Sequence, residues 1–162
     1  MKRNILILVS LCIAAAAFAS GSGGGGGGGG GNTSNTTSKS TQPTAADSYN
    51  AGYTLWKQEK YQQAAQFFST AISMKSDYAE AYNMLGFCTR KMGDLPKAIG
   101  YYETALKLKP NFPEAREYFG ETWLQQGNLA KAVQQYIILQ KANSKNAAEL
   151  LEKISDYVDK QM

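Results

Sequence analysis

The fold is decided by residues 79–112, which read AEAYNMLGFCTRKMGDLPKAIGYYETALKLKPNF. In each half of this stretch, apolar and small residues recur three and four positions apart, which is the spacing of one helix face. The first half carries Tyr82, Leu85, Gly86 and Thr89, and the second carries Leu95, Ala98, Ile99, Tyr102, Ala105 and Leu106. The stretch therefore predicts a pair of helices.

The two predicted helices are joined by Gly93 and Asp94. Glycine readily adopts the left-handed backbone that ends a helix, and aspartate is a favourable N-cap. With Asp94 as the cap, Pro96 falls in the first turn of the second helix, where its missing N–H costs no intrahelical hydrogen bond. We therefore expect Pro96 to start this helix and Pro110 to follow its end.

The same pattern recurs on both sides with a period of 34 residues. Residues 45–78, 79–112 and 113–146 align without a gap, and this periodicity indicates a repeat architecture. The shared positions are a glycine (Gly52, Gly86, Gly120), an alanine (Ala64, Ala98, Ala132) and an aromatic residue (Phe68, Tyr102, Tyr136). We expect the small residues to let helices approach closely, with the ring filling that contact in all three repeats.

One more helix is predicted for residues 147–162. Leu150, Leu151, Ile154 and Val158 are expected to face one way, with charged residues on the other side. Such a helix would act as a cap, because the last repeat of an array otherwise leaves its apolar face in water.

The N-terminal 19 residues have the pattern of a cleaved signal peptide. Lys2 and Arg3 precede an apolar run, and Ala17-Phe18-Ala19 fits a small-x-small cleavage site. The run is shorter than the roughly 20 residues needed to cross a bilayer. These features predict export to the periplasm or the cell exterior, with cleavage after Ala19. A retained anchor, or a lipoprotein formed through Cys12, is the alternative.

Residues 20–44 are predicted to be a low-complexity linker rich in Gly, Ser, Thr and Asn. No large apolar side chain is present there to offset the entropy of ordering the chain. Asn32 and Asn35 begin glycosylation sequons, which matter only in a eukaryotic host. The three repeats, residues 45–146, would then form the folded part together with the cap.

Composition excludes several classes of function. The chain contains no His and only two Cys, at positions 12 and 88, so the four Cys or His ligands of a structural zinc site are not available. The net charge is +4, and it falls to +2 without Lys2 and Arg3, which argues against a nucleic-acid partner. We expect a protein that is not an enzyme and that has no cofactor and no metal. A membrane contact is expected only if the N-terminal segment is retained.

The repeat resembles the tetratricopeptide repeat family. Repeat two matches the family pattern best, through Tyr82, Leu85, Gly86, Ala98, Tyr102, Ala105 and Pro110. The outer repeats depart from it at Ser48, Ser76, Leu139 and Ser144. The resemblance implies an all-α, right-handed solenoid whose first helices line a concave, peptide-binding groove.

The groove positions implied by the resemblance carry a mixture of aromatic, charged and amide residues. They include Tyr49, Tyr53, Trp56, Lys57, Asn83, Phe87, Arg90, Lys91, Glu117, Glu121 and Gln125. The aromatic residues of repeat one fall at i, i+4 and i+7, which places them on one helix face. Two alternatives stay open: the aromatic stripe covers the N-terminal edge of the array, and the charged residues form ion pairs between adjacent helices.

Two functions are compatible with these features. The first is an exported protein–protein interaction module that binds a peptide or helix of a partner in the groove. The second is a structural subunit or assembly factor of an envelope complex, such as a pilus or outer-membrane machinery, which acts through its convex face or its ends.

Overall fold

The computed structural model describes residues 42–162, and all regular secondary structure in this range is α-helical. The helices are α1 (Ala45–Lys57), α2 (Tyr61–Met74), α3 (Ala79–Lys91), α4 (Leu95–Leu108), α5 (Pro113–Gln125), α6 (Leu129–Lys141) and α7 (Asn146–Asp159). The predicted signal peptide and nearly all of the predicted linker lie outside the described residues.

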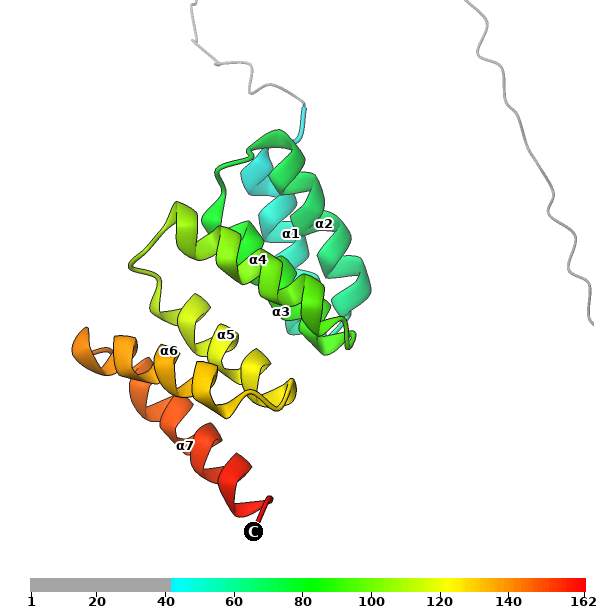
Figure 1. The fold of residues 1–162 in the computed structure, drawn as a ribbon. Helices are drawn as coiled ribbons and strands as arrows, with labels where there is room; N and C mark the ends of the chain where they lie inside the picture. Colours follow the sequence, from blue (N-terminus) through cyan, green and yellow to red (C-terminus); the bar gives the residue numbers. More distant parts are fainter. Residues whose placement is uncertain (1–41) are drawn as a thin grey trace, which may run out of the picture. The chain divides into compact units, whose positions relative to one another are not determined.

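The helices pack as consecutive pairs. α1 packs on α2, α3 on α4 and α5 on α6, and each second helix also packs on the first helix of the next pair. Figure 1 shows the pairs stacked in chain order, from α1 and α2 at one end to α7 at the other. The predicted all-α solenoid of three helical repeats and a C-terminal helix is confirmed.

The predicted helix boundaries have the expected chemistry. Gly93 and Gly127 have φ values of 90° and 81°, in the left-handed region that ends the first helices. The Asp94 side chain accepts a hydrogen bond from the backbone N–H of Lys97 at 3.2 Å, and Asn128 caps α6 in the same way. Pro96 lies in the first turn of α4, so it starts this helix as predicted.

Within each of the first two helix pairs, the first and second helices are held together by a close contact between a glycine and an aromatic ring. A Cβ atom added at Gly52 would lie 3.0 Å from Cδ1 of Phe68, and one added at Gly86 would lie 3.0 Å from Cε1 of Tyr102. Both rings are completely buried. The absence of a side chain on the first helix therefore creates the space that the ring of the second helix occupies.

The third repeat differs, and the prediction of a third ring contact is wrong. The space beside Gly120 is filled by Leu150 of α7, whose Cδ2 atom would lie 2.5 Å from an added Cβ. Tyr136 is only half-buried and packs at the side of the core. Leu139, which replaces the alanine of the other repeats, is buried in the same cluster as Leu150. The C-terminal helix thus takes the place that a ring occupies in repeats one and two.

The predicted apolar face of α7 also needs a correction. Leu150 and Ile154 are buried, Val158 is half-buried, and Leu151 is 46% exposed. Successive residues of an α-helix point about 100° apart, which turns Leu151 away from the side that packs on α5 and α6. The helix therefore covers the last repeat with a narrower stripe than the sequence suggests.

The contribution of the glycine–ring contact to stability can be tested by replacing glycine with valine at the contact and at a control position. Gly86→Val should lower the free energy of unfolding by about 2 kcal/mol, because the new side chain overpacks the buried ring of Tyr102. Gly100→Val is the control, since Gly100 is an exposed helix residue with nothing within 4 Å of an added Cβ. Urea unfolding of both variants measures the difference, and equal effects at the two sites would refute this packing role.

Candidate functional site

Side chains of the first helices form a continuous line of aromatic rings across three repeats. Tyr49 and Tyr53 stack in α1 with ring centroids 6.2 Å apart, and Trp56 follows 5.0 Å from Tyr53. Trp56 meets Phe87 of α3 edge to face at 5.6 Å, and Phe87 meets Tyr118 of α5 in the same way at 5.0 Å. These separations are typical of attractive ring pairs. We call these five residues the aromatic row.

The aromatic row follows from the repeat and the helix period. Three of its members lie on one face of α1, and Phe87 is the counterpart of Tyr53 one 34-residue repeat later. All five residues are half-buried, so each ring keeps part of its surface in contact with solvent. The face of α1, α3 and α5 that carries the row, which we call the inner face, is thus both apolar and accessible.

Positive charges lie over the rings. Lys57 Nζ is 4.9 Å from the ring centroid of Tyr53, and Lys91 Nζ is 5.6 Å from that of Phe87. Both lysines are exposed. Arg90 also stacks on Phe87, with its Cζ atom 5.0 Å from the centroid. Cations over aromatic faces are attracted by the ring quadrupole, so the row has a positive rim.

Below the rim, Arg90 is paired within the protein. Its Nη1 atom lies 2.7 Å from Oε2 of Glu121, and only 4% of the Arg90 side chain is exposed. For these two residues the ion-pair alternative is therefore the better description. Asn83 is also buried, and its Oδ1 atom accepts no hydrogen bond within residues 42–162. Trp56 Nε1 likewise has no partner there.

Glu117 joins α5 to α7. Its buried carboxylate accepts a hydrogen bond from Nδ2 of Asn146, at the start of α7. Burial raises the pKa of Glu117 to about 7, and the nearby carboxylates of Glu149 and Glu121 add to the increase, while the bond from Asn146 opposes it. Glu117 therefore belongs to the contact between these helices rather than to an open surface.

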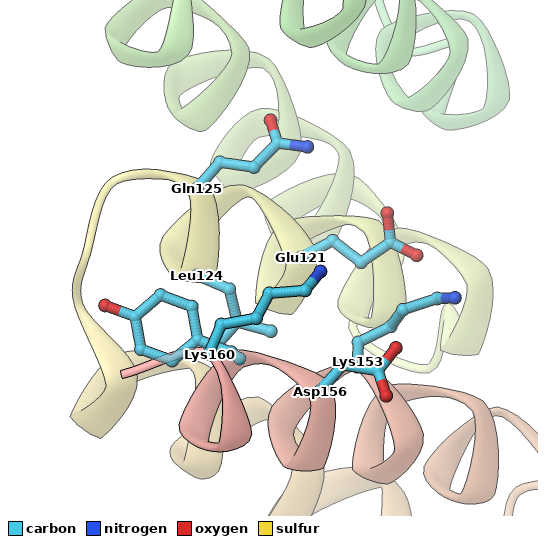
Figure 2. A pocket seen from close by; sticks show the side chains of 7 residues that line it. Glu121, Leu124, Gln125, Lys153, Asp156 and Lys160 are labelled. Carbon is cyan, nitrogen blue, oxygen red and sulfur yellow. The ribbon is translucent and has the colours of Figure 1, made fainter. Parts of the chain in front are cut away.

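A hollow of about 300 Å³ lies between α5 and α7. Figure 2 shows Glu121, Leu124 and Gln125 of α5 on one side and, on the other, Lys153 and Asp156 of α7 with Lys160, the residue directly after this helix. Tyr157 completes the lining, and Leu124 is buried at its base. We call this hollow the α5–α7 pocket.

The structure brings most of the predicted groove residues together but gives them different roles. The aromatic and lysine members are accessible, whereas Asn83, Arg90 and Glu117 are buried. Gln125 is exposed and lines the α5–α7 pocket with Glu121. Tyr49 also contacts Phe68 and Tyr78, so it packs against its own repeat, as the alternative of edge coverage expects.

The predicted set did not include two parts of this face. Tyr118 extends the aromatic row onto α5, but the groove positions implied by the family pattern do not include it. Lys153 of α7 was predicted only as part of the polar side of the cap, and Lys160, which directly follows α7, was not among the predicted residues. Their i, i+7 spacing, which places them on one side of the helix, is the only signal in the sequence that could have identified them.

Other chemistry is sparse in the described part of the chain. Residues 42–162 contain no group of three or more His, Cys, Asp or Glu residues that could hold a metal ion. In the same range, none of the helices has the length and apolar character that crossing a bilayer requires. Cys88 is buried, and burial raises the pKa of its thiol to about 12, which disfavours the reactive thiolate.

The sequence and the fold both have relatives. Two models of the tetratricopeptide repeat match the chain, one over residues 48–78 and the other over residues 79–112. A tetratricopeptide repeat-containing protein of Caenorhabditis elegans, trd-1, is 36% identical over 50 residues. That match covers 31% of this chain and only 6% of the nematode protein.

Two solved structures illustrate the likeness of the fold. MamA is 30% identical with a TM-score of 0.55, and the match covers 70% of this chain and 62% of MamA. The first tetratricopeptide domain of Spaghetti (RPAP3), solved with a peptide of HSP90, is 19% identical with a TM-score of 0.64. That match covers 72% of this chain and 94% of the domain.

The buried carboxylate predicts a pH-dependent stability. The pKa of folded Glu117, about 7, lies above its ordinary value of 4.5, so ionisation of Glu117 opposes folding. This penalty is absent below about pH 4.5 and complete above about pH 7. Relative to wild type, Glu117→Gln should therefore gain roughly 2–3 kcal/mol of unfolding free energy between pH 5 and pH 8.

Urea titrations at the two pH values measure this gain. Glu103→Gln, at an exposed glutamate of α4, is the control and should show no such change. A gain of the same size in both variants, or none in Glu117→Gln, would contradict the assignment.

Proposed function

This chain belongs to the tetratricopeptide repeat family, and from that premise we propose that it is a non-enzymatic module that binds other proteins. The binding site is the inner face of α1, α3 and α5. It takes a segment of a partner protein against the aromatic row. The observation that carries the proposal is the continuity of the row, from Tyr49 to Tyr118, across all three repeats.

Two further observations support this assignment. A hydrophobic core would enclose its rings, yet every ring of the row keeps accessible surface, and aromatic residues are enriched where partners bind. The same fold in the RPAP3 domain accommodates a peptide. By analogy, we expect this chain to recognise a segment of a protein.

Recognition would combine apolar burial with a few polar contacts. Apolar side chains of the partner would cover the exposed parts of the rings. Burial of apolar surface is the dominant favourable contribution to the free energy of most protein associations. Trp56 Nε1 and Asn83 Oδ1 are a donor and an acceptor without partners in residues 42–162. They would be satisfied by the backbone of a bound segment, once side chains at the surface adjust.

The experiment is a pull-down from the native host with the full chain. The double variant Tyr53→Ala/Trp56→Ala should weaken capture of the partner at least tenfold, because aromatic hot spots contribute about 2 kcal/mol or more. Phe67→Ala is the matched control, since Phe67 is an exposed aromatic residue on the second helix α2. Circular dichroism confirms that each variant is folded.

One observation favours the alternative, an assembly subunit that acts through the second helices. A hollow of about 560 Å³ lies between α2, α3 and α4 and is lined by Gln66, Met92 and Tyr101 among others. If the same partners bind the aromatic variant with unchanged affinity while Gln66→Glu loses them, the inner-face proposal is wrong and this alternative holds.

We also propose that the protein is exported, with residues 1–19 removed as a signal peptide. The support is the basic, apolar and small-x-small pattern of these residues. N-terminal sequencing of the protein from its host should find Ser20 as the first residue. Ala19→Leu should block this processing, whereas Cys12→Ala should not affect it. A mature chain that begins at Cys12 or Met1 would contradict cleavage after Ala19.

A further inference from the structure

We infer that the partner segment bound by the aromatic row is rich in proline and binds in the extended polyproline II conformation. This inference rests on the proposed function. It adds the chemical class of the partner: an uncharged segment in which proline recurs about every third residue, which is one turn of this conformation.

The inner face offers hydrogen-bond donors to a partner. Trp56 Nε1 is a buried donor without a partner within residues 42–162. Tyr49 and Tyr118 add phenol hydroxyls from half-buried positions. Burial raises the pKa of Tyr49 to about 12 and also raises the pKa of Tyr118, so both hydroxyls stay protonated and can donate at neutral pH. A segment that supplies backbone acceptors therefore complements this face.

A proline-rich segment supplies acceptors and few donors. Proline has no backbone N–H, and polyproline II makes no internal hydrogen bonds, so its carbonyl oxygens stay free. An α-helix uses its carbonyl oxygens internally and would leave Trp56 Nε1 without a partner. A β-strand would bring an N–H with nearly every carbonyl, and Asn83 Oδ1, an unpaired buried acceptor, can accept from only one or two of them. One residue between two prolines keeps the N–H that Asn83 needs.

The spacing and the exposure of the rings suit proline side chains. Neighbouring ring centroids of the aromatic row are 5.0–6.2 Å apart, so alternate rings present about one contact for each turn of roughly 9 Å in polyproline II. Grooves lined by aromatic rings are a recurring site of polyproline II recognition, because the segment is ordered before it binds and loses little entropy. The accessible parts of the half-buried rings would be covered by pyrrolidine rings.

Charges of both signs are mixed along the inner face. Two lysines lie over rings of the row, and the charges of two glutamates raise the pKa of its tyrosines: Lys57, Lys91, Glu80 and Glu114. The α5–α7 pocket adds two lysines and two carboxylates: Lys153, Lys160, Glu121 and Asp156. Because neither sign dominates, an uncharged segment matches this face best. The lysines over the rings are exposed and such contacts are weak, so their side chains can move aside.

The test uses two phage libraries of 12-residue peptides, selected side by side on the full chain. In one library every third residue is proline, and in the other the same positions carry alanine. The proline library should yield binders at least tenfold more often. Synthetic copies of the strongest binders, with both termini blocked, are then titrated by fluorescence anisotropy. Their affinity should change less than about twofold between 0.05 M and 0.5 M NaCl, because no net charge is involved.

Trp56→Phe should weaken these peptides about fivefold, because it removes the Nε1 donor and keeps an aromatic ring in the row. Tyr101→Phe is the matched control, since it removes one phenol donor from a half-buried position on the second helix α4. This control should change the affinity less than about twofold. Replacing the prolines of a bound peptide by alanine should weaken it about tenfold or more.

The outcomes separate this inference from the proposed function. If the alanine library yields binders as often, and Tyr53→Ala/Trp56→Ala loses them, the row is a binding site but the proline-rich class is wrong, and a helical segment is the better occupant. An affinity that falls more than fivefold at the higher salt concentration would show a charged partner instead. Proline peptides that bind Tyr53→Ala/Trp56→Ala as they bind wild type would overturn this inference, and loss of the host partner in the pull-down would still support the proposed function.

Discussion

The structure depends on one steric constraint: within a repeat, the second helix approaches a glycine of the first helix closely. Without a Cβ at Gly52 and Gly86, the rings of Phe68 and Tyr102 lie where a side chain would otherwise stand. This contact sets the distance between the paired helices. The pairing repeats every 34 residues, so the first helices α1, α3 and α5 follow one another along the array. The side chains that they turn away from their second helices therefore come together on the inner face.

At the C-terminal end the same constraint is met by a different group. Leu150 of α7 replaces an aromatic ring beside Gly120, so the last helix packs directly on α5. The Glu117–Asn146 hydrogen bond lies in the same contact. As a result α7 is more than a cover for the apolar core. It forms one wall of the α5–α7 pocket, which Lys153, Asp156 and Tyr157 line.

Local signals in the sequence were enough to predict the helices. Gly93, Asp94 and Pro96 specify a helix end, a cap and a helix start through the backbone alone, so these predictions were confirmed. The contacts made by Leu150 and Tyr118 depend on how different repeats pack, and no periodicity specifies that packing. The burial of Arg90 could not be predicted either, because its partner, Glu121, lies 31 positions away.

The central claim is that partners bind on the inner face, and photo-cross-linking tests it most directly. Benzoyl-phenylalanine placed at Phe87, on the inner face, should cross-link a partner protein in the native host. The same group at Phe67, an exposed position on α2, should not. Cross-links from position 67 to the same partner, with none from position 87, would contradict the account.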